Sequence, residues 1–369
     1  MDALAYLQKA FLLAQKANPK DIRPNPYVGA IIVDENGVIK GEGYHKKLGE
    51  PHAEVHAIQE ALENQTDLSK STLYVTLEPC SHFGKTPPCT NALINAKIAR
   101  VIAAMEDPNP LVAGKGLHVL KEAGIEVRCG LFEKEAQEIN VGFIKRMQTG
   151  MPWVRMKIAA SLDGITALPN GKSQWITSSE ARLDGHRFRA QACAILTGIG
   201  TIKEDNPQLN VRDLDTPRQP IRVVVDSKLE IPIDANIFKS GKTVVFCANV
   251  DDAHFLKVSE HLTQNGHELI RLPNSADKVD LTKALAYLAQ HHQTNEIHVE
   301  AGHKLNGSLL RESCVDELLV YLAPKLLGTG SNLANLGPLN SLEEADTWQV
   351  IDQTSIGPDI RIRLIKPGS

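Results

Sequence analysis

Four side chains in the first quarter of the chain have the types and spacing needed for hydrolytic zinc chemistry. His52 is followed two residues later by Glu54, and Pro79-Cys80 is followed by a second cysteine, Cys89, in one Gly/Pro-rich stretch. One imidazole and two thiolates would give Zn²⁺ three protein ligands and leave its fourth position open for water. A carboxylate that does not bind the metal can then move protons between that water and a leaving amine. The pattern predicts one catalytic zinc ion per chain, with Glu54 as the catalytic proton carrier.

Two other interpretations of these residues stay open. His52 and His56 lie four residues apart, as in the H-E-x-x-H motif of zinc proteases, but Glu54 then has the wrong offset and both cysteines lack a role. A purely structural zinc site would need four protein ligands, whereas the chain offers three and a spare carboxylate. A lone H-x-E triplet is weak evidence; its combination with Pro-Cys and a second cysteine favours deaminase-type chemistry.

The local sequence predicts how the histidine and the glutamate are positioned. Apolar residues at Val55, Ile58 and Leu62 have the spacing of an amphipathic helix that begins near residue 53. His52 and Glu54 would therefore lie at the first turn of this helix, and both can face a metal near its end.

The cysteines are expected at the ends of two further elements. A β-rich run at 71–77 leads to Cys80, and Cys89 opens a predicted helix at 90–96. Free backbone N–H groups at a helix start favour a thiolate. The metal would then lie between two helix starts, at the end of one strand.

The first half of the chain resembles the deaminase half of the bifunctional riboflavin-biosynthesis deaminase/reductase family. Eight residues separate Cys80 from Cys89, against two in the generic cytidine-deaminase signature, and the longer interval is typical of this family. The resemblance implies a cytidine-deaminase-like domain that acts on a pyrimidine bearing a ribose phosphate, with Asn25 as the candidate for holding the pyrimidine. A plain Asn-Pro turn is the alternative role for Asn25. The segments that carry the resemblance are 25–29, 49–56, 76–82 and 107–110.

Composition and charge narrow the class of protein. The chain has 369 residues, of which 42% are hydrophobic, which is enough for two domains with separate cores. A net charge of −4 gives no basic footprint for nucleic acid. We find neither a signal-peptide pattern nor an apolar run long enough to cross a bilayer, and so expect a cytoplasmic protein without membrane contact. The remaining cysteines are expected to stand alone in the core or on the surface, without forming disulfides: Cys129, Cys193, Cys247 and Cys314.

Strand and helix patterns alternate along both halves, which predicts two α/β domains. The first, 1–149, is expected as a three-layer α/β/α domain that ends in a helix at 133–146. The second, 150–369, is expected as a mostly parallel sheet with helices on both faces and with 360–365 as an edge strand. Its predicted strands are 153–159, 193–198, 221–226, 243–247, 267–272, 296–300 and 317–322, and its predicted helices are 179–191, 251–264, 281–292 and 303–312.

A dinucleotide-binding fingerprint is only half present in the second domain. Gly198-Ile199-Gly200 follows a predicted strand but lacks the third glycine of G-x-G-x-x-G. The segment 296–308 reads as a strand, a glycine turn and a helix start, a geometry that binds phosphate through backbone N–H groups. An ordinary βα loop is the alternative.

The second half resembles the reductase half of the same family, which has a dihydrofolate-reductase-like α/β fold. The resemblance is carried by 157–164, 173–178, 200–207, 225–227 and 323–328. It implies that NADPH is bound by Ala159, Trp175, Thr201, Asp205, Ser227, Gly302, His303, Lys304, Leu305, Asn306, Gly307 and Ser308. It implies that the substrate is held by Ser173, Arg189, Leu209, Arg212 and Glu300. It also suggests a homo-oligomer.

Physical chemistry makes several of these implied roles reasonable. Arg189 and Arg212 supply two guanidinium groups for a ribose 5-phosphate, although either could be a solvated surface charge. Lys157, Asp205 and Glu300 could each orient or protonate the sugar. The sequence thus predicts two reactions on a small molecule: zinc-dependent deamination of a diaminopyrimidinone ribosylamine phosphate, then reduction of its ribose by NADPH. A deaminase with an idle second domain is the alternative.

Overall fold

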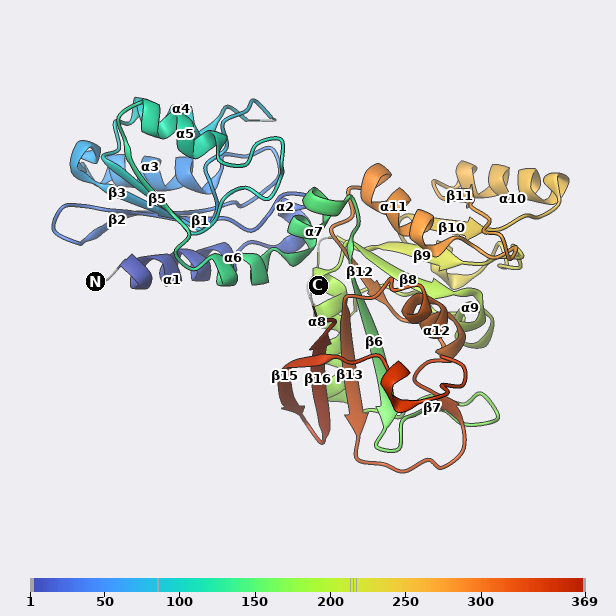
Figure 1. The fold of residues 1–369 in the computed structure, drawn as a ribbon. Helices are drawn as coiled ribbons and strands as arrows, with labels where there is room; N and C mark the ends of the chain where they lie inside the picture. The colour runs from blue at the N-terminus through green and yellow to red at the C-terminus, as the bar shows by residue number, and fades with distance from the viewer. Residues whose placement is uncertain (1–2, 85, 213, 215, 217, 368–369) are drawn as a thin grey trace. The chain divides into compact units, whose positions relative to one another are not determined.

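The computed structural model describes residues 3–84, 86–212, 214, 216 and 218–367 (Figure 1). Contacts divide the chain into two compact units, Met1–Gly150 and Met151–Ser369. Gly150 has a φ of 72° and ends the last helix of the first unit, a left-handed position that glycine adopts without steric cost.

The first unit contains a five-stranded sheet in the order β2-β1-β3-β4-β5. β1 runs antiparallel to β2 and β3, whereas β3, β4 and β5 are parallel. β1 and β3 are buried along their whole length, which explains their continuous apolar runs. The strands are β1 (Gly29–Val33), β2 (Ile39–Tyr44), β3 (Thr72–Val75), β4 (Arg100–Ala103) and β5 (Glu126–Cys129).

Helices cover both faces of this sheet and give the predicted three-layer α/β/α arrangement (Figure 1). On one face of the sheet, Ala30, Ile32 and Leu73 pack against α3, α4 and α5. On the other face, Ile31 and Val33 pack against α1. The helices of this unit are α1 (Ala3–Ala14), α2 (Pro19–Ile22), α3 (Ala53–Glu63), α4 (Cys89–Asn95), α5 (Lys115–Glu122), α6 (Glu133–Ile139) and α7 (Val141–Thr149), with a 3₁₀ turn at Leu68–Lys70.

The helix predicted at 133–146 is wrong as one element, because it is two helices that meet at Asn140. The Asn140 side chain accepts a hydrogen bond from the Tyr27 backbone N–H at 2.8 Å and donates one to the Tyr27 carbonyl at 3.1 Å. This side chain is buried and its backbone leaves the helical region at φ −123°. A tertiary contact with residue 27 therefore interrupts a segment whose local pattern is helical.

The second unit contains a nine-stranded sheet in the order β11-β10-β9-β8-β12-β6-β13-β16-β15. The strands from β11 to β13 in this order are parallel, and β16 and β15 are antiparallel additions at one end. The strands are β6 (Trp153–Ser161), β8 (Ala194–Gly198), β9 (Ile221–Val225), β10 (Thr243–Cys247), β11 (Glu268–Arg271), β12 (Glu296–Val299), β13 (Glu317–Ala323), β15 (Gln349–Ile356) and β16 (Asp359–Ile365), with β7 (Ile165–Ala167) and β14 (Ser331–Asn332) paired separately.

Helices lie on both faces of this sheet too, as predicted. One core joins the sheet to α11 and α12, and a second joins its other face to α9 and α10, while Ala181 of α8 packs on Leu319 and Tyr321. The helices are α8 (Ser179–Gln191), α9 (Ile199–Asp205), α10 (Asp252–Gln264), α11 (Leu281–His291) and α12 (His303–Arg311), with 3₁₀ turns at Asn236–Phe238 and Leu342–Glu344.

The prediction that 360–365 is an edge strand is wrong. β16 pairs with β13 on one side and β15 on the other, so β15 is the edge. The two strands form a hairpin in which Gly357 has a φ of 58°. β15 escaped prediction because five of its eight residues are polar and it is half exposed.

Within the described residues, no helix has the length and apolar character needed to span a membrane.

Candidate functional site

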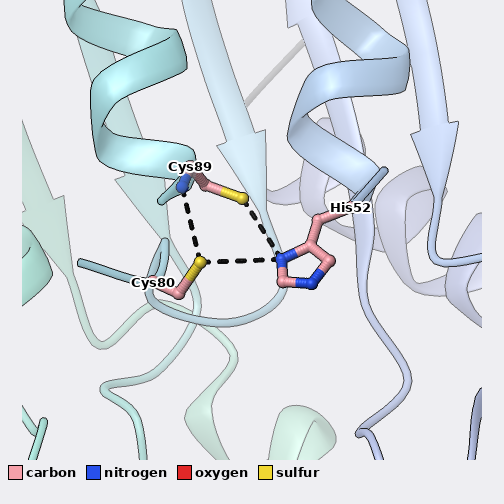
Figure 2. Close-up of side chains that lie close together, drawn as sticks. All are labelled: His52, Cys80 and Cys89. Carbon is pink, nitrogen blue, oxygen red and sulfur yellow. Dashed lines mark hydrogen bonds between the residues drawn. The ribbon is translucent and has the colours of Figure 1, made fainter. Parts of the chain in front are cut away.

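The predicted zinc ligands converge at the ends of three elements of the first unit (Figure 2). His52 is the N-cap residue of α3, and Cys89 is the first residue of α4. Cys80 lies in the loop after β3, and Figure 2 shows its sulfur close to the start of α4 and facing the His52 ring. The backbone N–H of Cys89 donates to Cys80 Sγ at 3.4 Å, so the start of α4 stabilises the thiolate.

The separations of the donor atoms fit tetrahedral zinc. His52 Nδ1 lies 3.6 Å from Cys80 Sγ and 3.3 Å from Cys89 Sγ, and the three atoms lie within 4.8 Å of one another. Zinc bonds of ~2.3 Å to sulfur and ~2.05 Å to nitrogen, at the tetrahedral angle, would separate nitrogen from sulfur by about 3.6 Å. Two thiolates and one imidazole also form a donor set that zinc prefers. The alternative ligand pair of His52 and His56 is not supported, because His56 is outside this cluster.

The protonation states of the ligands suit a cation. A hydrogen bond from the Cys89 thiol, followed by one from His52, lowers the pKa of Cys80 to about 4 despite its burial. The Cys89 thiol keeps the proton that it donates, and both this hydrogen bond and burial raise its pKa. A divalent cation among these three donors would replace that shared proton.

Glu54 lies beside the cluster and is one of the most deeply buried acidic groups of the unit. Its side chain is 3% exposed, and its Oε2 atom has no hydrogen-bond partner among the described residues. Burial raises the pKa of Glu54 to about 7, and the nearby Cys80 adds to this rise. A carboxyl group with a pKa near neutrality can both accept and release a proton, which is the role predicted for it.

Two residues extend the zinc cluster toward β1 and β2. The His45 ring meets the His52 ring edge to face, with 5.3 Å between the ring centroids. The Asn25 side-chain amide donates to His45 Nε2 at 3.1 Å. Asn25, the candidate pyrimidine ligand, therefore contacts a residue that itself packs on the predicted metal ligand His52. Burial, then the charge of His52, lowers the pKa of His45 to about 4 and keeps the ring neutral. Sequence reasoning missed His45, whose position at the end of β2 was the available signal.

A buried carboxylate supports the loop that carries Cys80, and sequence reasoning missed it as well. Glu78 is 5% exposed and accepts four backbone N–H groups. They come from Asp107, Gly114, Gly116 and Leu117 at 2.9, 2.9, 2.7 and 3.2 Å. A Cβ at Gly116 would lie 2.1 Å from the Pro79 carbonyl, so the start of α5 packs directly on the peptide before Cys80.

The predicted reductase residues gather at the carboxyl edge of the parallel sheet in the second unit. The second unit begins with the interior strand β6, places β8 to β11 to one side of it, and then inserts β12 between β6 and β8. Ligands of open α/β sheets bind at the carboxyl ends of strands where the order reverses in this way. Ala159 lies in β6, Thr201 and Asp205 in α9 after β8, Ser227 after β9, and Glu300 directly after β12.

Arg189 and Glu300 form a largely buried ion pair with two hydrogen bonds at this edge. The Arg189 guanidinium pairs with both carboxylate oxygens, with 2.8 Å between Nη2 and Oε2, and Nη1 donates to the Asn210 carbonyl next to Leu209. Burial alone would raise the pKa of Glu300, but Arg189 holds it well below 4.5. Burial lowers the pKa of the nearby Lys157, opposed by Glu300.

Trp175 is exposed, and several contacts hold the segment that carries it in place. Its ring is 63% exposed, and the Arg182 guanidinium lies 4.4 Å from the ring centroid. Lys325 Nζ donates to the Ile176 carbonyl at 2.8 Å, and the Gln174 side-chain amide donates to Asp205 Oδ1 at 3.2 Å. These contacts bring Trp175 and Asp205 to neighbouring positions, with Ser173 two residues before the ring. Arg182 was not predicted.

The glycine segments of β8 and α12 lie side by side. A Cβ on Gly198 would meet Leu305 Cδ2 at 3.1 Å, so the turn at Gly198-Ile199-Gly200 lies against the first turn of α12. His303 lines a cavity of about 380 Å³ whose other wall is formed by residues 330–332 and 334–337. The predicted phosphate-binding loop therefore borders a cavity.

Other predicted residues are less closely joined to this group. Arg212 is exposed, and its backbone N–H donates to His186 Nδ1 at 3.2 Å. The Ser227 hydroxyl accepts the Val279 N–H at 3.1 Å. Within α12, Lys304 is exposed, Ser308 donates to the Lys304 carbonyl, and the buried Asn306 donates to the Leu333 carbonyl, while Gly307 lies against the Asn335 backbone.

Comparison with known proteins divides the chain in the same order. Residues 2–105 match the family described as the cytidine and deoxycytidylate deaminase zinc-binding region, and residues 152–360 match the RibD C-terminal domain. Riboflavin biosynthesis protein RibD of Escherichia coli K12 is 44% identical over 374 residues, which cover 98% of each chain. RibD of Bacillus amyloliquefaciens is 42% identical over 365 residues, which cover 98% of this chain and 95% of that protein.

Solved structures agree with the sequence matches. Acinetobacter baumannii RibD superposes with a TM-score of 0.89 at 39% identity, covering 98% of both chains. A Thermotoga maritima protein described as a diaminohydroxyphosphoribosylaminopyrimidine deaminase/5-amino-6-(5-phosphoribosylamino)uracil reductase gives a TM-score of 0.83 at 29% identity, covering 99% of this chain and 98% of that one.

The fold and the matches define an enzyme with two parts, a deaminase of the zinc-binding cytidine-deaminase type followed by a reductase. Both folds expected from the sequence are thereby confirmed. The chain belongs to the RibD family of riboflavin biosynthesis proteins.

Proposed function

We propose that residues 1–149 hydrolyse 2,5-diamino-6-(5-phosphoribosylamino)pyrimidin-4-one at the carbon that bears the 2-amino group, with one zinc ion bound by His52, Cys80 and Cys89. The observation that carries this proposal is the set of three donor atoms at zinc-compatible separations beside a buried, unpaired carboxylate oxygen. The description of the Thermotoga maritima relative names the same class of substrate.

The protein's own groups account for the proton movements of this step. Zinc, when bound, supplies a Lewis acid that makes water a nucleophile at neutral pH. Glu54 accepts a proton from the attacking water and returns it to the departing amino group, so that ammonia leaves. The second proton of the water passes to the ring nitrogen as the ring carbonyl forms. The raised pKa of Glu54 suits both halves of this transfer. Asn25 and the neutral His45 ring form the neighbouring wall, where a pyrimidine would lie.

We propose that residues 150–369 then reduce the product to 5-amino-6-(5-phosphoribitylamino)uracil. NADPH, when bound, supplies a hydride to C1 of the ring-opened ribosyl group. Its site would be formed by Trp175, Asp205 and the glycine segments of β8 and α12, with the other cofactor residues named from the sequence. Glu300, held anionic by Arg189, and Lys157 would orient the sugar, and the exposed Arg212 would meet the phosphate together with Ser173 and Leu209.

We also propose that the protein is a cytoplasmic homo-oligomer. The thiol ligands must stay reduced to bind zinc, which favours a reducing compartment. β15 is an edge strand that exposes Val350 and Ile351, and unpaired edges of this kind pair with a second copy in many oligomers. Light scattering coupled to size-exclusion chromatography would give the molecular mass directly.

The decisive experiment separates the two activities. We expect Glu54→Ala to abolish ammonia release while NADPH oxidation with pre-deaminated substrate persists. The expectation follows because Glu54 lies in the first unit and the predicted reductase residues lie in the second. Ammonia release and NADPH absorbance would be followed separately on the same preparations.

Two outcomes would contradict the proposal. Loss of both activities in a folded Glu54→Ala protein would mean that the sites are not separate. A wild-type protein that releases ammonia but neither binds nor oxidises NADPH would leave the second unit as an idle partner of a deaminase.

A further inference from the structure

The loop between the two cysteine ligands contains a hydroxyl group that touches the third ligand. Thr86 Oγ1 lies 3.2 Å from His52 Nε2, while the other ring nitrogen, Nδ1, faces both sulfur atoms. The two nitrogens of the His52 ring therefore have different partners, one on the metal side and one on the loop side. Lys85, the residue before Thr86, lies outside the described residues.

Metal binding through Nδ1 would require one particular tautomer of the imidazole. A neutral histidine carries its proton on one ring nitrogen and offers a lone pair on the other. Nδ1 can bind a metal only if the proton is on Nε2, and that N–H then needs an acceptor. The Thr86 oxygen is within hydrogen-bonding distance of that atom and can accept the proton of Nε2.

The backbone around Thr86 places this oxygen with respect to both cysteines. Gly84 N–H donates to the Thr86 carbonyl at 3.3 Å and so joins two residues of the loop. Pro87 and Pro88 follow and restrict the backbone up to Cys89. The Thr90 N–H donates to the Cys80 carbonyl at 3.2 Å and joins the two ends of the loop.

We propose that Thr86 is a positioning residue for the zinc site, whose hydroxyl accepts His52 Nε2–H and so holds the ring with Nδ1 toward the metal. The long interval between Cys80 and Cys89 thereby contributes an outer-shell group to the site. The proposal rests on the proposed zinc ligation. Removing such a partner of a ligating histidine weakens metal binding by roughly 10–100-fold.

Zinc affinity of the metal-free full-length protein tests this role without any assay of catalysis. We would measure it by competition with a chromogenic chelator for wild type, Thr86→Val, Thr86→Ser and Thr66→Val. Thr86→Val removes the hydroxyl at similar size, and Thr86→Ser keeps it. Thr66→Val is the matched control, since the Thr66 hydroxyl is buried without a hydrogen-bond partner among the described residues. Thermal unfolding of each metal-free protein checks the fold.

We expect Thr86→Val to raise the zinc dissociation constant roughly tenfold or more, with Thr86→Ser and Thr66→Val near wild type. The visible spectrum of the Co²⁺-substituted protein should change in Thr86→Val alone. Wild-type affinity in Thr86→Val would overturn the proposal. Equal losses in Thr86→Ser and Thr86→Val would overturn it too, because serine keeps the hydroxyl and the loss would then come from altered packing.

Failure of the proposed function looks different. Cys80→Ser removes a ligand and should nearly abolish zinc binding. If wild type fails to bind zinc, or if Cys80→Ser binds it as tightly as wild type, the ligand assignment itself is wrong and the role of Thr86 is overturned with it.

Discussion

Two buried glutamates show how single residues acquire opposite properties. Burial raises the pKa of Glu54 to about 7, because the loss of hydration and the charge of Cys80 outweigh the opposing charge of His52. Burial would raise the pKa of Glu300 as well, but the Arg189 fork and His298 bring it well below 4.5. Glu54 can therefore exchange a proton near neutral pH, whereas Glu300 remains an anion that can orient a substrate.

Arg189→Lys tests whether the planar guanidinium is needed at the second site. Lysine keeps the charge but cannot form the two parallel bonds to Glu300 or reach the Asn210 carbonyl at the same time. We expect the reductase kcat/KM to fall at least about tenfold, since one charge-assisted hydrogen bond contributes ~1.5–3 kcal/mol. Deaminase activity should stay at the wild-type level, measured as ammonia release on the same preparation.

Arg187→Lys is the matched control for this substitution. Arg187 lies on the same helix, α8, and its side chain is 63% exposed. We expect no change in either activity. An Arg189→Lys protein with wild-type reductase kinetics would show that charge alone suffices at this position.

At the scale of elements, the zinc site depends on how loops are attached to the ends of β3 and β4. Glu78 N–H donates to the Met105 carbonyl at 2.9 Å, and its carboxylate collects N–H groups from the 107–117 segment. Gly116 is required at the contact with Pro79, where a Cβ would overlap the carbonyl. One buried side chain thus joins the start of α5 to the loop that carries Cys80.

Glu78→Gln should destabilise the first unit. Glutamine has one acceptor oxygen in place of two, so it leaves buried N–H groups of the 107–117 segment without a partner. We expect a loss of about 1–3 kcal/mol in the free energy of unfolding. Denaturant titration monitored by circular dichroism would measure it, with Asp34→Asn in the exposed turn between β1 and β2 as a milder control. Equal losses in both variants would contradict a special role for Glu78.

At the scale of the whole molecule, the two units use buried charge differently. The second unit places charged side chains in its sheet interior, where Glu317 pairs with Arg155 at 2.9 Å and Arg363 at 2.7 Å and accepts the Trp153 indole N–H. Burial opposes ionisation of Glu317, but the two arginines lower its pKa below 4.5. An ion network of this kind makes the unit sensitive to acid.

The pH dependence of stability follows from this lowered pKa. The contribution of Glu317 is fully present above its unfolded value of about 4.5 and is lost as pH falls through the lower folded value. We expect the unfolding temperature of the wild type to fall steeply below about pH 4.5. Glu317→Gln should cost about 3 kcal/mol at pH 7 and show a shallower fall, because it cannot be protonated. Calorimetry at a series of pH values would decide; parallel curves would contradict the prediction.

Local patterns were enough to predict most elements and the residues that converge in the His52–Cys80–Cys89 cluster. His52, Glu54 and Cys89 lie at helix starts that apolar spacing and proline reveal, and Cys80 follows a β-rich run. The alternation of strand and helix patterns predicted both layered folds, because each of these patterns is local in the sequence. The two errors have different causes. Asn140 breaks a helix by bonding the distant Tyr27, whereas β16 is not the edge because its hairpin partner β15, half exposed and mostly polar, was not recognised as a strand.

The sequence by itself determined the types of chemical group, their order along the chain and the elements that carry them. Only the tertiary structure decided which groups meet, since the partners are far apart in the chain. It paired Thr86 with His52, Arg189 with Glu300, and Glu78 with the start of α5. The same packing decides which groups are buried. Burial raises the pKa of Glu54 to about 7, at which the carboxyl group can both accept and release a proton near neutral pH.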